Sequence, residues 1–431
     1  MTAGRQDGRT AEVLHLPMPG VDLLLQRKPG VPLVSLGLYQ RRHLVETMED
    51  AGLAVLAIRS AVRGAGEHDA AGLALAFERL GGVLGTAPGS EWFGFTTSVL
   101  SRYALDAVGL LDLVFRHPTL APAEVAREQQ TLLDSVLQHA DDMSRYPVEL
   151  AFRARFGPSG YGLPVAGIPE SIRRLTLEQV RRWHRSALDA PARRPVLVAV
   201  GDLDPPGFAE AAGKLLESYP RRLEDRTPIM RIPPGADAPL LAEERSKRQT
   251  AMAFLFPGPD RGSPARFAAE VWSAIAGGLG GRLFVALRDR LSLAYVVRAS
   301  AWQRAGAGAF LVYLATSPER EEEARAALRA ELAGFRDALP DPAELERAIR
   351  YLSGQILIGR QTGASMAAEL AEAWLSLGDA GLREVRDPVA GIRQVTGASI
   401  REMAATSFRD DLGVEGIVRG TMPAAMFRPH G

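Results

Sequence analysis

The chain contains an internal repeat with a period of 220 residues. Phe115 and Arg116 precede a Pro-Ala-Glu segment and a further Arg, and the same residue types recur 220 positions later, at Phe335, Arg336, Pro342-Ala343-Glu344 and Arg347. More loosely, residues 32–39 resemble residues 251–256. A repeat of this length indicates two copies of one fold in tandem. We therefore expect two tandem homologous domains, with function between the halves or between pairs of such chains.

The length of the chain supports the same division. A chain of 431 residues exceeds what one hydrophobic core normally stabilises, so we expect two domains of about 200 residues each. The segment 220–238 is rich in Pro and Arg and is the best candidate for a linker. The predicted domains are therefore residues 1–219 and 239–431.

Charge and composition exclude several classes of function. With 51 basic and 51 acidic side chains, the chain has no net field to attract nucleic acid or an anionic membrane, and phosphate binding is not indicated. The absence of cysteine excludes disulfides and thiolate chemistry. No apolar run reaches signal-peptide or membrane-span character, which predicts a cytoplasmic protein without membrane partners. Abundant Ala, Arg and Gly are typical of a GC-rich bacterial genome.

The apolar patterns of the first half predict alternating strands and helices. Residues 21–26 and 33–39 read as strands joined by the turn Lys28-Pro29-Gly30, which predicts an opening hairpin. Apolar periodicity then predicts helices at 51–61, 69–80, 104–115 and 122–138, and strands at 93–99 and 195–201. Pro122 suits the first turn of its helix, because the missing N–H is not needed there.

The second half repeats this order. The expected strands are 250–256, 294–299, 309–315 and 413–420, and the expected helices are 265–276, 282–290, 319–335, 342–358 and 364–375. The predicted fold class is α+β: each domain has an antiparallel-leaning β-sheet with helices packed on one face.

One segment of the first half resembles a known active-site helix. Gly52-Leu53-Ala54, followed by Arg63-Gly64 and by Leu80-Gly81-Gly82, resembles the pitrilysin/insulinase family of zinc metallopeptidases. The resemblance implies an H-x-x-E-H motif directly after Gly-Leu-Ala, in which two His bind zinc and the Glu acts as a base. In this chain those positions hold Val55, Ile58 and Arg59. The family's third ligand, a Glu, would fall near Ser135, with Asp134 beside it.

The substitutions remove the chemistry of a zinc site. A hydrolytic zinc needs three ligands with lone pairs and a polar group that accepts the proton of water, and Val and Ile supply neither. Arg59 would bring a positive charge towards the cation. No other H-x-x-E-H or H-E-x-x-H occurs, and the seven His are scattered without ligand spacing. We predict that this chain binds no metal or other cofactor.

A second motif lies in the second half. Gly280-Gly281-Arg282-Leu283-Phe284, followed by Leu287-Arg288 and Leu293-Ala294-Tyr295, resembles the family's paired Arg and Tyr. The resemblance implies that Arg288 and Tyr295 are the catalytic residues of this chain, binding the substrate backbone and stabilising the developing oxyanion. The spacing agrees, because one turn between a helix end and a strand start can bring both donors to one surface. In isolation the pair would read as a solvated cation and a half-buried aromatic.

Three functional hypotheses follow. In the first, the chain is the non-zinc subunit of a heterodimeric metalloendopeptidase: it is no peptidase on its own, it binds unfolded peptide, and zinc is expected in a homologous partner with an intact H-x-x-E-H. In the second, the chain is an inactive scaffold or peptide-binding subunit of a larger assembly, like the core proteins of cytochrome bc1, and a homodimer is the alternative to a heterodimer. In the third, it is an independent hydrolase with a different metal arrangement, which a metal assay would detect.

Overall fold

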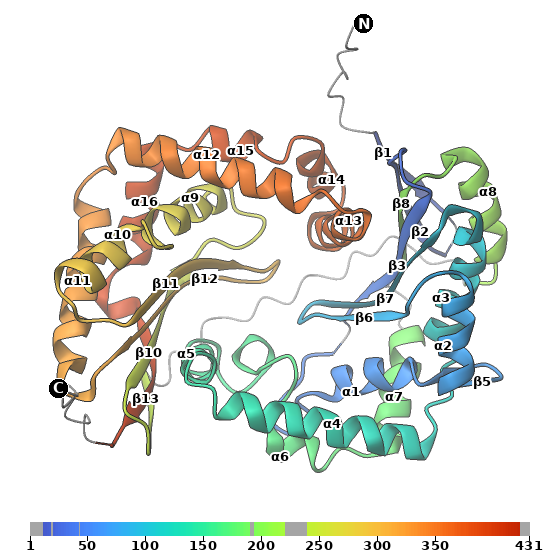
Figure 1. Cartoon of the computed structure of the whole chain (residues 1–431), viewed down its shortest axis with the longest axis horizontal. Coiled ribbons are helices and arrows are strands. Elements are labelled where there is room, and N and C mark those ends of the chain that lie inside the picture. Colours follow the sequence, from blue (N-terminus) through green and yellow to red (C-terminus); the bar gives the residue numbers. More distant parts are fainter. Residues whose placement is uncertain (1–11, 19, 43, 190–193, 220–238, 423–431) are drawn as a thin grey trace, which may run out of the picture.

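The structure is a computed structural model that describes residues 12–18, 20–42, 44–189, 194–219 and 239–422. Two β-sheets lie towards opposite ends of an elongated molecule, and helices surround each of them (Figure 1). The strands of the first sheet come from residues before 202 and those of the second from residues after 239. The predicted linker, 220–238, lies outside the described residues, and the domain limits at 219 and 239 remain a prediction.

The first sheet has six strands in the order β1-β2-β8-β3-β7-β6. Their bounds are β1 (Val13–Pro17), β2 (Asp22–Arg27), β3 (Leu33–Arg41), β6 (Gly85–Pro88), β7 (Trp92–Leu100) and β8 (Val196–Gly201). Only the pair β2 and β8 is parallel, so the predicted antiparallel bias is confirmed.

The predicted opening hairpin is wrong, because β8 lies between β2 and β3 and pairs with both. All six residues of β8 are buried. A strand that is apolar on both faces is stable in the middle of a sheet, where both faces are covered. The 28–32 connection therefore passes over β8 instead of closing a two-stranded turn.

The first half contains eight α-helices in the described residues. They are α1 (Leu53–Ala61), α2 (Ala70–Arg79), α3 (Ala104–Arg116), α4 (Pro122–Ala140), α5 (Tyr146–Phe156), α6 (Pro169–Ile172), α7 (Leu177–Asp189) and α8 (Pro205–Leu215). Of these, α1, α2, α3 and α4 match the four predicted helices closely. A two-stranded pair, β4 (Gly64–Ala65) with β5 (His68–Asp69), precedes α2. Phe77, Phe95 and Phe115 are buried between these helices and the sheet, which places one hydrophobic core on that face.

The second sheet has the order β11-β12-β10-β13-β9, in which only β13 and β9 are parallel. Its strands are β9 (Leu240–Arg245), β10 (Thr250–Gly258), β11 (Val296–Gln303), β12 (Gly308–Thr316) and β13 (Val414–Gly420). The helices of this half are α9 (Arg266–Ala276), α10 (Arg282–Phe284), α11 (Glu321–Asp337), α12 (Pro342–Gly359), α13 (Gly363–Leu377), α14 (Asp379–Arg386), α15 (Ala390–Arg393) and α16 (Gly397–Ser407). Strand for strand this order repeats β6-β7-β3-β8-β2, which confirms the repeat.

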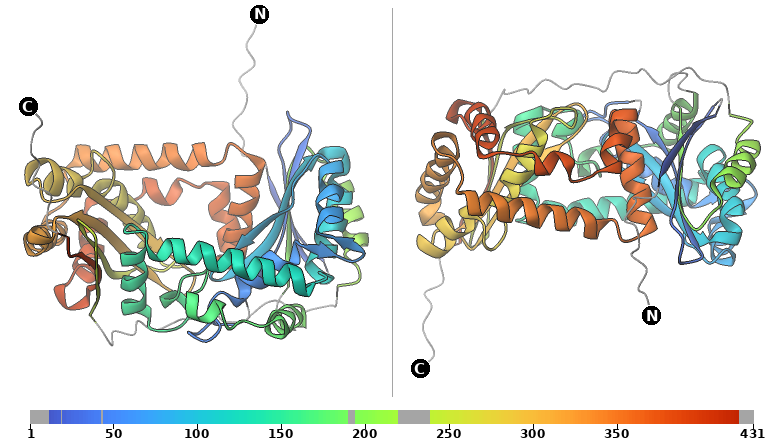
Figure 2. Two further views of the ribbon diagram at one scale, coloured as in Figure 1. Left: turned by 60° about the horizontal axis from the view of Figure 1, so that its bottom comes forward. Right: turned by 90° about the horizontal axis from the view of Figure 1, so that it is seen from above.

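Each half also covers the sheet of the other half with one helix. Helix α5 of the first half packs on β10 and β13, and α13 of the second half packs on β3 and β8 (Figures 1 and 2). The approach of α5 is close, because a Cβ at Gly416 in β13 would lie 2.1 Å from the carbonyl oxygen of Pro147. Residues 146 and 366 are one repeat apart, so the two helices are equivalent. Other helices lie on one face of each sheet, and α5 and α13 cover the other face.

Polar contacts reinforce the junction between the halves. The carboxylate of Glu91, in the β6–β7 turn, accepts hydrogen bonds from the backbone N–H groups of Ala305 and Gly306, both at 3.2 Å, and from the Tyr161 hydroxyl. The indole of Trp302 packs against Tyr161, with ring centroids 5.1 Å apart. The two halves therefore form one interlocked unit. No helix in the described part of the chain is both long and apolar enough to cross a membrane.

Candidate functional site

Helix α1 begins where the Gly-Leu-Ala segment requires it to begin. Gly52 has φ +91°, and a Cβ there would lie 2.7 Å from the carbonyl oxygen of Ala166, so only glycine fits. The carboxylate of Glu46 accepts hydrogen bonds from the N–H groups of Gly52, at 3.1 Å, and Ala54, at 2.8 Å. These contacts satisfy two donors at the helix start and fix the direction of α1.

The three positions of the metal motif on α1 have become structural. Val55 and Ile58 are 4% and 1% exposed and belong to the hydrophobic core of the first half. Arg59 instead turns towards α4, where its Nε lies 2.9 Å from the carboxylate of Glu128. Arg63, one helical turn further on, donates to the other oxygen of the same carboxylate at 2.6 Å. Two cations and one buried carboxylate therefore join α1 to α4.

The expected position of the third ligand needs correction. Glu128, not Ser135 or Asp134, is the residue of α4 whose carboxylate faces α1, and its side chain is 2% exposed. Asp134 is exposed and accepts a hydrogen bond from Gln130 on its own helix. The sequence contained a sign of this, because Glu128 occupies the apolar stripe formed by Val125, Leu132 and Val136. A carboxylate in such a stripe needs a buried partner.

These residues do not fit a zinc ion. Two of the three positions lack lone pairs, and the guanidinium of Arg59 already pairs with Glu128, the carboxylate of α4 that faces this helix. Across the described residues no group of three or more His, Cys, Asp and Glu side chains is arranged to hold a metal ion.

Arg288 and Tyr295 lie on either side of a tightly constrained turn. Arg288 belongs to a π-helical turn, residues 285–290, and Tyr295 directly precedes β11. The carbonyl oxygen of Leu287 accepts hydrogen bonds from the N–H groups of Leu293, at 2.8 Å, and Ala294, at 3.2 Å. Arg288 directly follows Leu287, and Tyr295 directly follows Ala294. Because a hydrogen bond joins Leu287 to Ala294, the backbones of Arg288 and Tyr295 lie close together. The predicted end of a helix and start of a strand are confirmed.

The backbone of this turn is unusual. Ser292 has φ +50°, a left-handed conformation that costs a non-glycine residue about 1 kcal/mol or more. The guanidinium of Arg320 donates to the Ser292 carbonyl oxygen at 2.7 Å and holds the turn in place. Single π-helical turns and strained residues are frequent at functional sites, where the surrounding structure maintains them. The turn is therefore a candidate site on structural grounds.

The two side chains are available to a ligand. Tyr295 is 54% exposed and Arg288 is exposed, with its guanidinium 4.9 Å from the centre of the Phe284 ring. Among the described residues neither side chain forms a hydrogen bond or an ion pair. A guanidinium and a phenol are both donors that suit a carbonyl oxygen. The arrangement can bind a peptide carbonyl.

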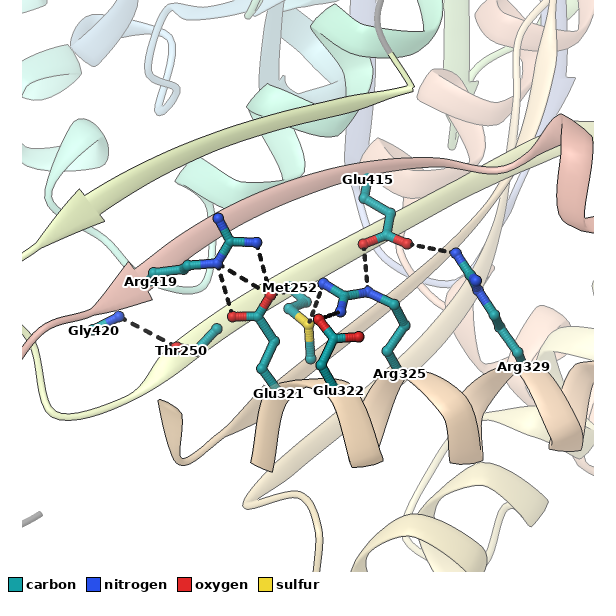
Figure 3. Close-up of polar contacts among 9 residues, drawn as sticks. All are labelled: Thr250, Met252, Glu321, Glu322, Arg325, Arg329, Glu415, Arg419 and Gly420. Atoms are coloured by element: carbon teal, nitrogen blue, oxygen red, sulfur yellow. Dashed lines mark hydrogen bonds and ion pairs between the residues drawn. The ribbon is translucent and has the colours of Figure 1, made fainter. Parts of the chain in front are cut away.

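A second polar cluster lies between α11 and the second sheet (Figure 3). It consists of alternating acids and cations, namely Glu321, Glu322, Arg325, Arg329, Glu415 and Arg419. Arg325 donates to the carboxylates of Glu415, at 2.9 Å, and Glu321, at 2.7 Å. Burial would raise the pKa of Glu321, but hydrogen bonds from Arg419 and Arg325 outweigh it and lower that pKa. Because every charge is paired, we assign this cluster a structural role.

The fold and the altered α1 site define the class of this protein: a two-domain peptidase fold whose metal-binding positions are filled by apolar residues and an ion pair. The model of the peptidase M16 inactive domain matches residues 174–352. An uncharacterized zinc protease of Mycobacterium tuberculosis is 26% identical over 370 residues, which cover 84% of this chain and 81% of that protein. An uncharacterized zinc protease of Bacillus subtilis is 23% identical over 368 residues, covering 83% and 87%.

Solved structures agree on the fold. The peptidase M16 inactive domain from Pseudomonas fluorescens superposes with a TM-score of 0.82 at 21% identity, covering 96% of this chain and 98% of that one. A protease from Helicobacter pylori gives a TM-score of 0.81 at 15% identity, with coverage of 95% and 100%. A chain of Complex III2 from Candida albicans gives 0.77 at 15% identity, with coverage of 94% and 96%. Over most of its length the chain is similar to peptidases of the M16 family, the pitrilysin/insulinase family, and residues 174–352 match the model of that family's inactive domain.

Proposed function

We propose that this chain is the zinc-free subunit of a heterodimeric zinc metallopeptidase. In this proposal it binds unfolded peptide and supplies Arg288 and Tyr295 to a reaction centre whose zinc lies in a homologous partner chain. The chain alone does not cleave peptides. The single observation that carries the proposal is the contrast between the two motifs: the positions on α1 are buried and paired, while Arg288 and Tyr295 are exposed and unpaired among the described residues.

The chemistry of the pair supports this role. A scissile carbonyl gains negative charge in the transition state, and fixed donors aimed at its oxygen stabilise that charge. The contacts of Leu287 and Arg320 fix the backbone on both sides of the turn, so little ordering would be needed when a substrate binds. In this proposal the group that activates water comes from the zinc-bearing partner chain.

The position of Tyr295 also suits an extended substrate. Tyr295 leads directly into β11, which is one of the two edge strands of the second sheet. An edge strand offers backbone N–H and C=O groups with which an extended peptide can pair, independently of the peptide's side chains. Such pairing favours unfolded chains over folded ones, because only an unfolded chain can present its own backbone.

Co-expression with a zinc-bearing homologue that contains H-x-x-E-H tests the proposal. The complex should cleave an unfolded peptide, and Arg288→Ala or Tyr295→Phe in this chain should lower kcat/KM by roughly 100-fold, the effect typical of removing one oxyanion donor. Arg290→Ala and Tyr351→Phe are matched controls, because both residues are exposed and lie outside the pair. If no complex forms with such a homologue, or if the two variants cleave as fast as the controls, the proposal is wrong.

The second candidate function is that of a scaffold or peptide-binding subunit without catalysis. It is favoured by the likeness in fold to a chain of Complex III2 and by the conversion of the α1 positions into a structural ion pair. Size-exclusion chromatography of the native assembly distinguishes the two, together with peptide cleavage assays. A stable assembly without peptidase activity, unchanged by Arg288→Ala, would favour scaffolding, and a single self-associated species would favour a homodimer.

A further inference from the structure

A basic cavity of about 560 Å³ lies at the seam between the two halves. The first half contributes the end of β2, and the second half contributes the ends of α12 and α14 together with α13 and α15. Five cations and one carboxylate line it: Arg27, Lys28, Arg360, Arg386, Arg393 and Asp387. This local excess of positive charge stands out in a chain whose net charge is zero.

Two of the cations form a fixed floor. The Arg360 guanidinium, 10% exposed, donates to the carboxylate of Glu369 at 2.7 Å and to the carbonyl oxygen of Val385 at 2.9 Å. The ammonium of Lys28 donates to the carbonyl oxygens of Arg360, at 3.2 Å, and Gln361, at 2.5 Å. These contacts hold both cations in place without a ligand, and the second crosses from one half of the chain to the other.

Two other cations at the cavity remain unpaired. Arg27 and Arg393 are exposed, and within the described residues neither forms an ion pair or a hydrogen bond through its side chain. Like charges gathered in one cavity repel each other, and a bound anion relieves that repulsion. Arginine suits this task, because its planar guanidinium can donate two parallel hydrogen bonds to a carboxylate or phosphate group.

We propose that this cavity binds a small polyvalent oxyanion, carried by phosphate or carboxylate groups. The volume is sufficient for a small molecule rather than a single water or monovalent ion. Met366 and Leu357 provide an apolar wall beside the cations, which suits a ligand with an uncharged body. Because the lining comes from both halves, the ligand bridges them and stabilises their relative position. This inference is independent of the proposed peptidase role.

Isothermal titration of the full chain with tripolyphosphate and, separately, with citrate tests the site and distinguishes the two sources of oxyanion. We expect saturable binding by at least one of them and a rise in melting temperature. The affinity should fall when the NaCl concentration is raised from 50 to 300 mM, because salt screens the attraction between the cations and the anion. The screening (Debye) length is on the order of 10 Å at 0.1 M ionic strength and shortens as salt is added. Binding only by tripolyphosphate would assign a phosphate ligand, and binding only by citrate a carboxylate one.

Variants at the exposed rim make the test specific. Arg27→Ala and Arg393→Ala should each weaken binding about tenfold, the effect of losing one charge-assisted hydrogen bond. The matched control is Arg347→Ala, an exposed arginine on α12 away from the cavity, which should bind like the parent. The proposal is overturned if neither anion binds saturably at millimolar concentration, or if the control loses as much affinity as the rim variants.

Discussion

The guanidinium of Arg59 lies 2.9 Å from the carboxylate of Glu128 and joins α1 to α4 at the place where the family's active members would hold a metal ion. The carboxylate is 2% exposed, while Arg59 and Arg63 are 29% and 45% exposed. If Glu128 is replaced, water can therefore solvate the two guanidinium groups. If both arginines are replaced, the Glu128 carboxylate stays buried without a partner. We therefore expect the variants of these residues to differ in their free energy of unfolding.

Removing both cations should be more damaging than removing the acid. Arg59→Ala with Arg63→Ala leaves a buried, unpaired carboxylate, and we expect a loss of about 3 kcal/mol in the free energy of unfolding. Glu128→Gln leaves only cations that can be solvated, and should cost less. Urea unfolding measures both, with Arg182→Ala as the control, because its ion pair with Glu178 is exposed and should contribute under about 1 kcal/mol. An equal loss in all three variants would contradict this account.

The purified chain should contain no stoichiometric zinc. Val55 and Ile58 cannot coordinate a metal, so treatment with EDTA should leave the melting temperature of the isolated chain unchanged. Elemental analysis by mass spectrometry, before and after dialysis against zinc, measures the metal content. One tightly held equivalent would revive the hypothesis of an independent hydrolase with another ligand set.

Glu149, on α5, should make the chain less stable at alkaline pH. Burial raises the pKa of this carboxyl from 4.5 to about 7, and the nearby Arg153 and Arg145 only partly oppose the shift. Because the folded pKa is the higher one, its stabilising contribution is full below pH 4.5 and is lost as the pH rises through 7. Glu149→Gln should therefore raise the free energy of unfolding at pH 8 by about 2 kcal/mol, a figure reduced because the side chain is partly exposed. At pH 5 the substitution should change the free energy of unfolding little.

Chemical denaturation of the parent and of Glu149→Gln across pH 5 to 8 provides the measurement. Glu178→Gln, at an exposed site on α7, is the control and should show no such dependence. A parallel pH profile for Glu149→Gln and the parent would show that this carboxyl titrates normally.

The ion network of the second half should contribute to stability at neutral pH and lose its effect in acid. Hydrogen bonds from Arg419 and Arg325 outweigh burial and lower the pKa of Glu321, so its contribution is present above the ordinary carboxyl pKa and lost as the pH falls through the lowered value. Arg325→Met should cost about 3 kcal/mol at pH 7, because it leaves buried carboxylates short of a partner.

The difference between Arg325→Met and the parent should shrink as the pH falls through the lowered pKa of Glu321 and its carboxylate becomes protonated. Arg329→Ala serves as the control, because its side chain is 49% exposed and its loss should cost under about 1 kcal/mol. A difference that stays constant from pH 7 to pH 3 would show that Arg325 acts through packing alone.

Much of the fold could be predicted from local patterns, because those patterns depend on neighbours in the chain. Pro122 and Pro342 begin α4 and α12 as the repeat predicts, and Phe115 and Phe335 occupy equivalent core positions. Helix α5 was not predicted from the sequence. Its low amphipathicity has a physical cause: it is covered by the sheet of the other half, and its buried residues include Pro147, Ala151 and Arg155.

The candidate site divides in the same way. Loss of the metal ligands follows from residue identity alone, since Val55 and Ile58 have no lone pairs in any fold. The partner of Arg59 could not be identified, because Glu128 is 69 residues away along the chain and meets it only when α1 packs on α4. The basic cavity could not be predicted for a similar reason. The sequence contains equal numbers of acidic and basic residues, and these totals do not show which side chains lie together in the fold.

The sequence by itself therefore determined the repeat, the positions of most helices and strands, and the chemistry that this chain lacks, because these depend on residue type and short-range spacing. Only the tertiary structure decided the central place of β8, the exchange of α5 and α13, and which charges meet. Those outcomes depend on contacts between segments tens to hundreds of residues apart, where burial and pairing are set by the whole fold.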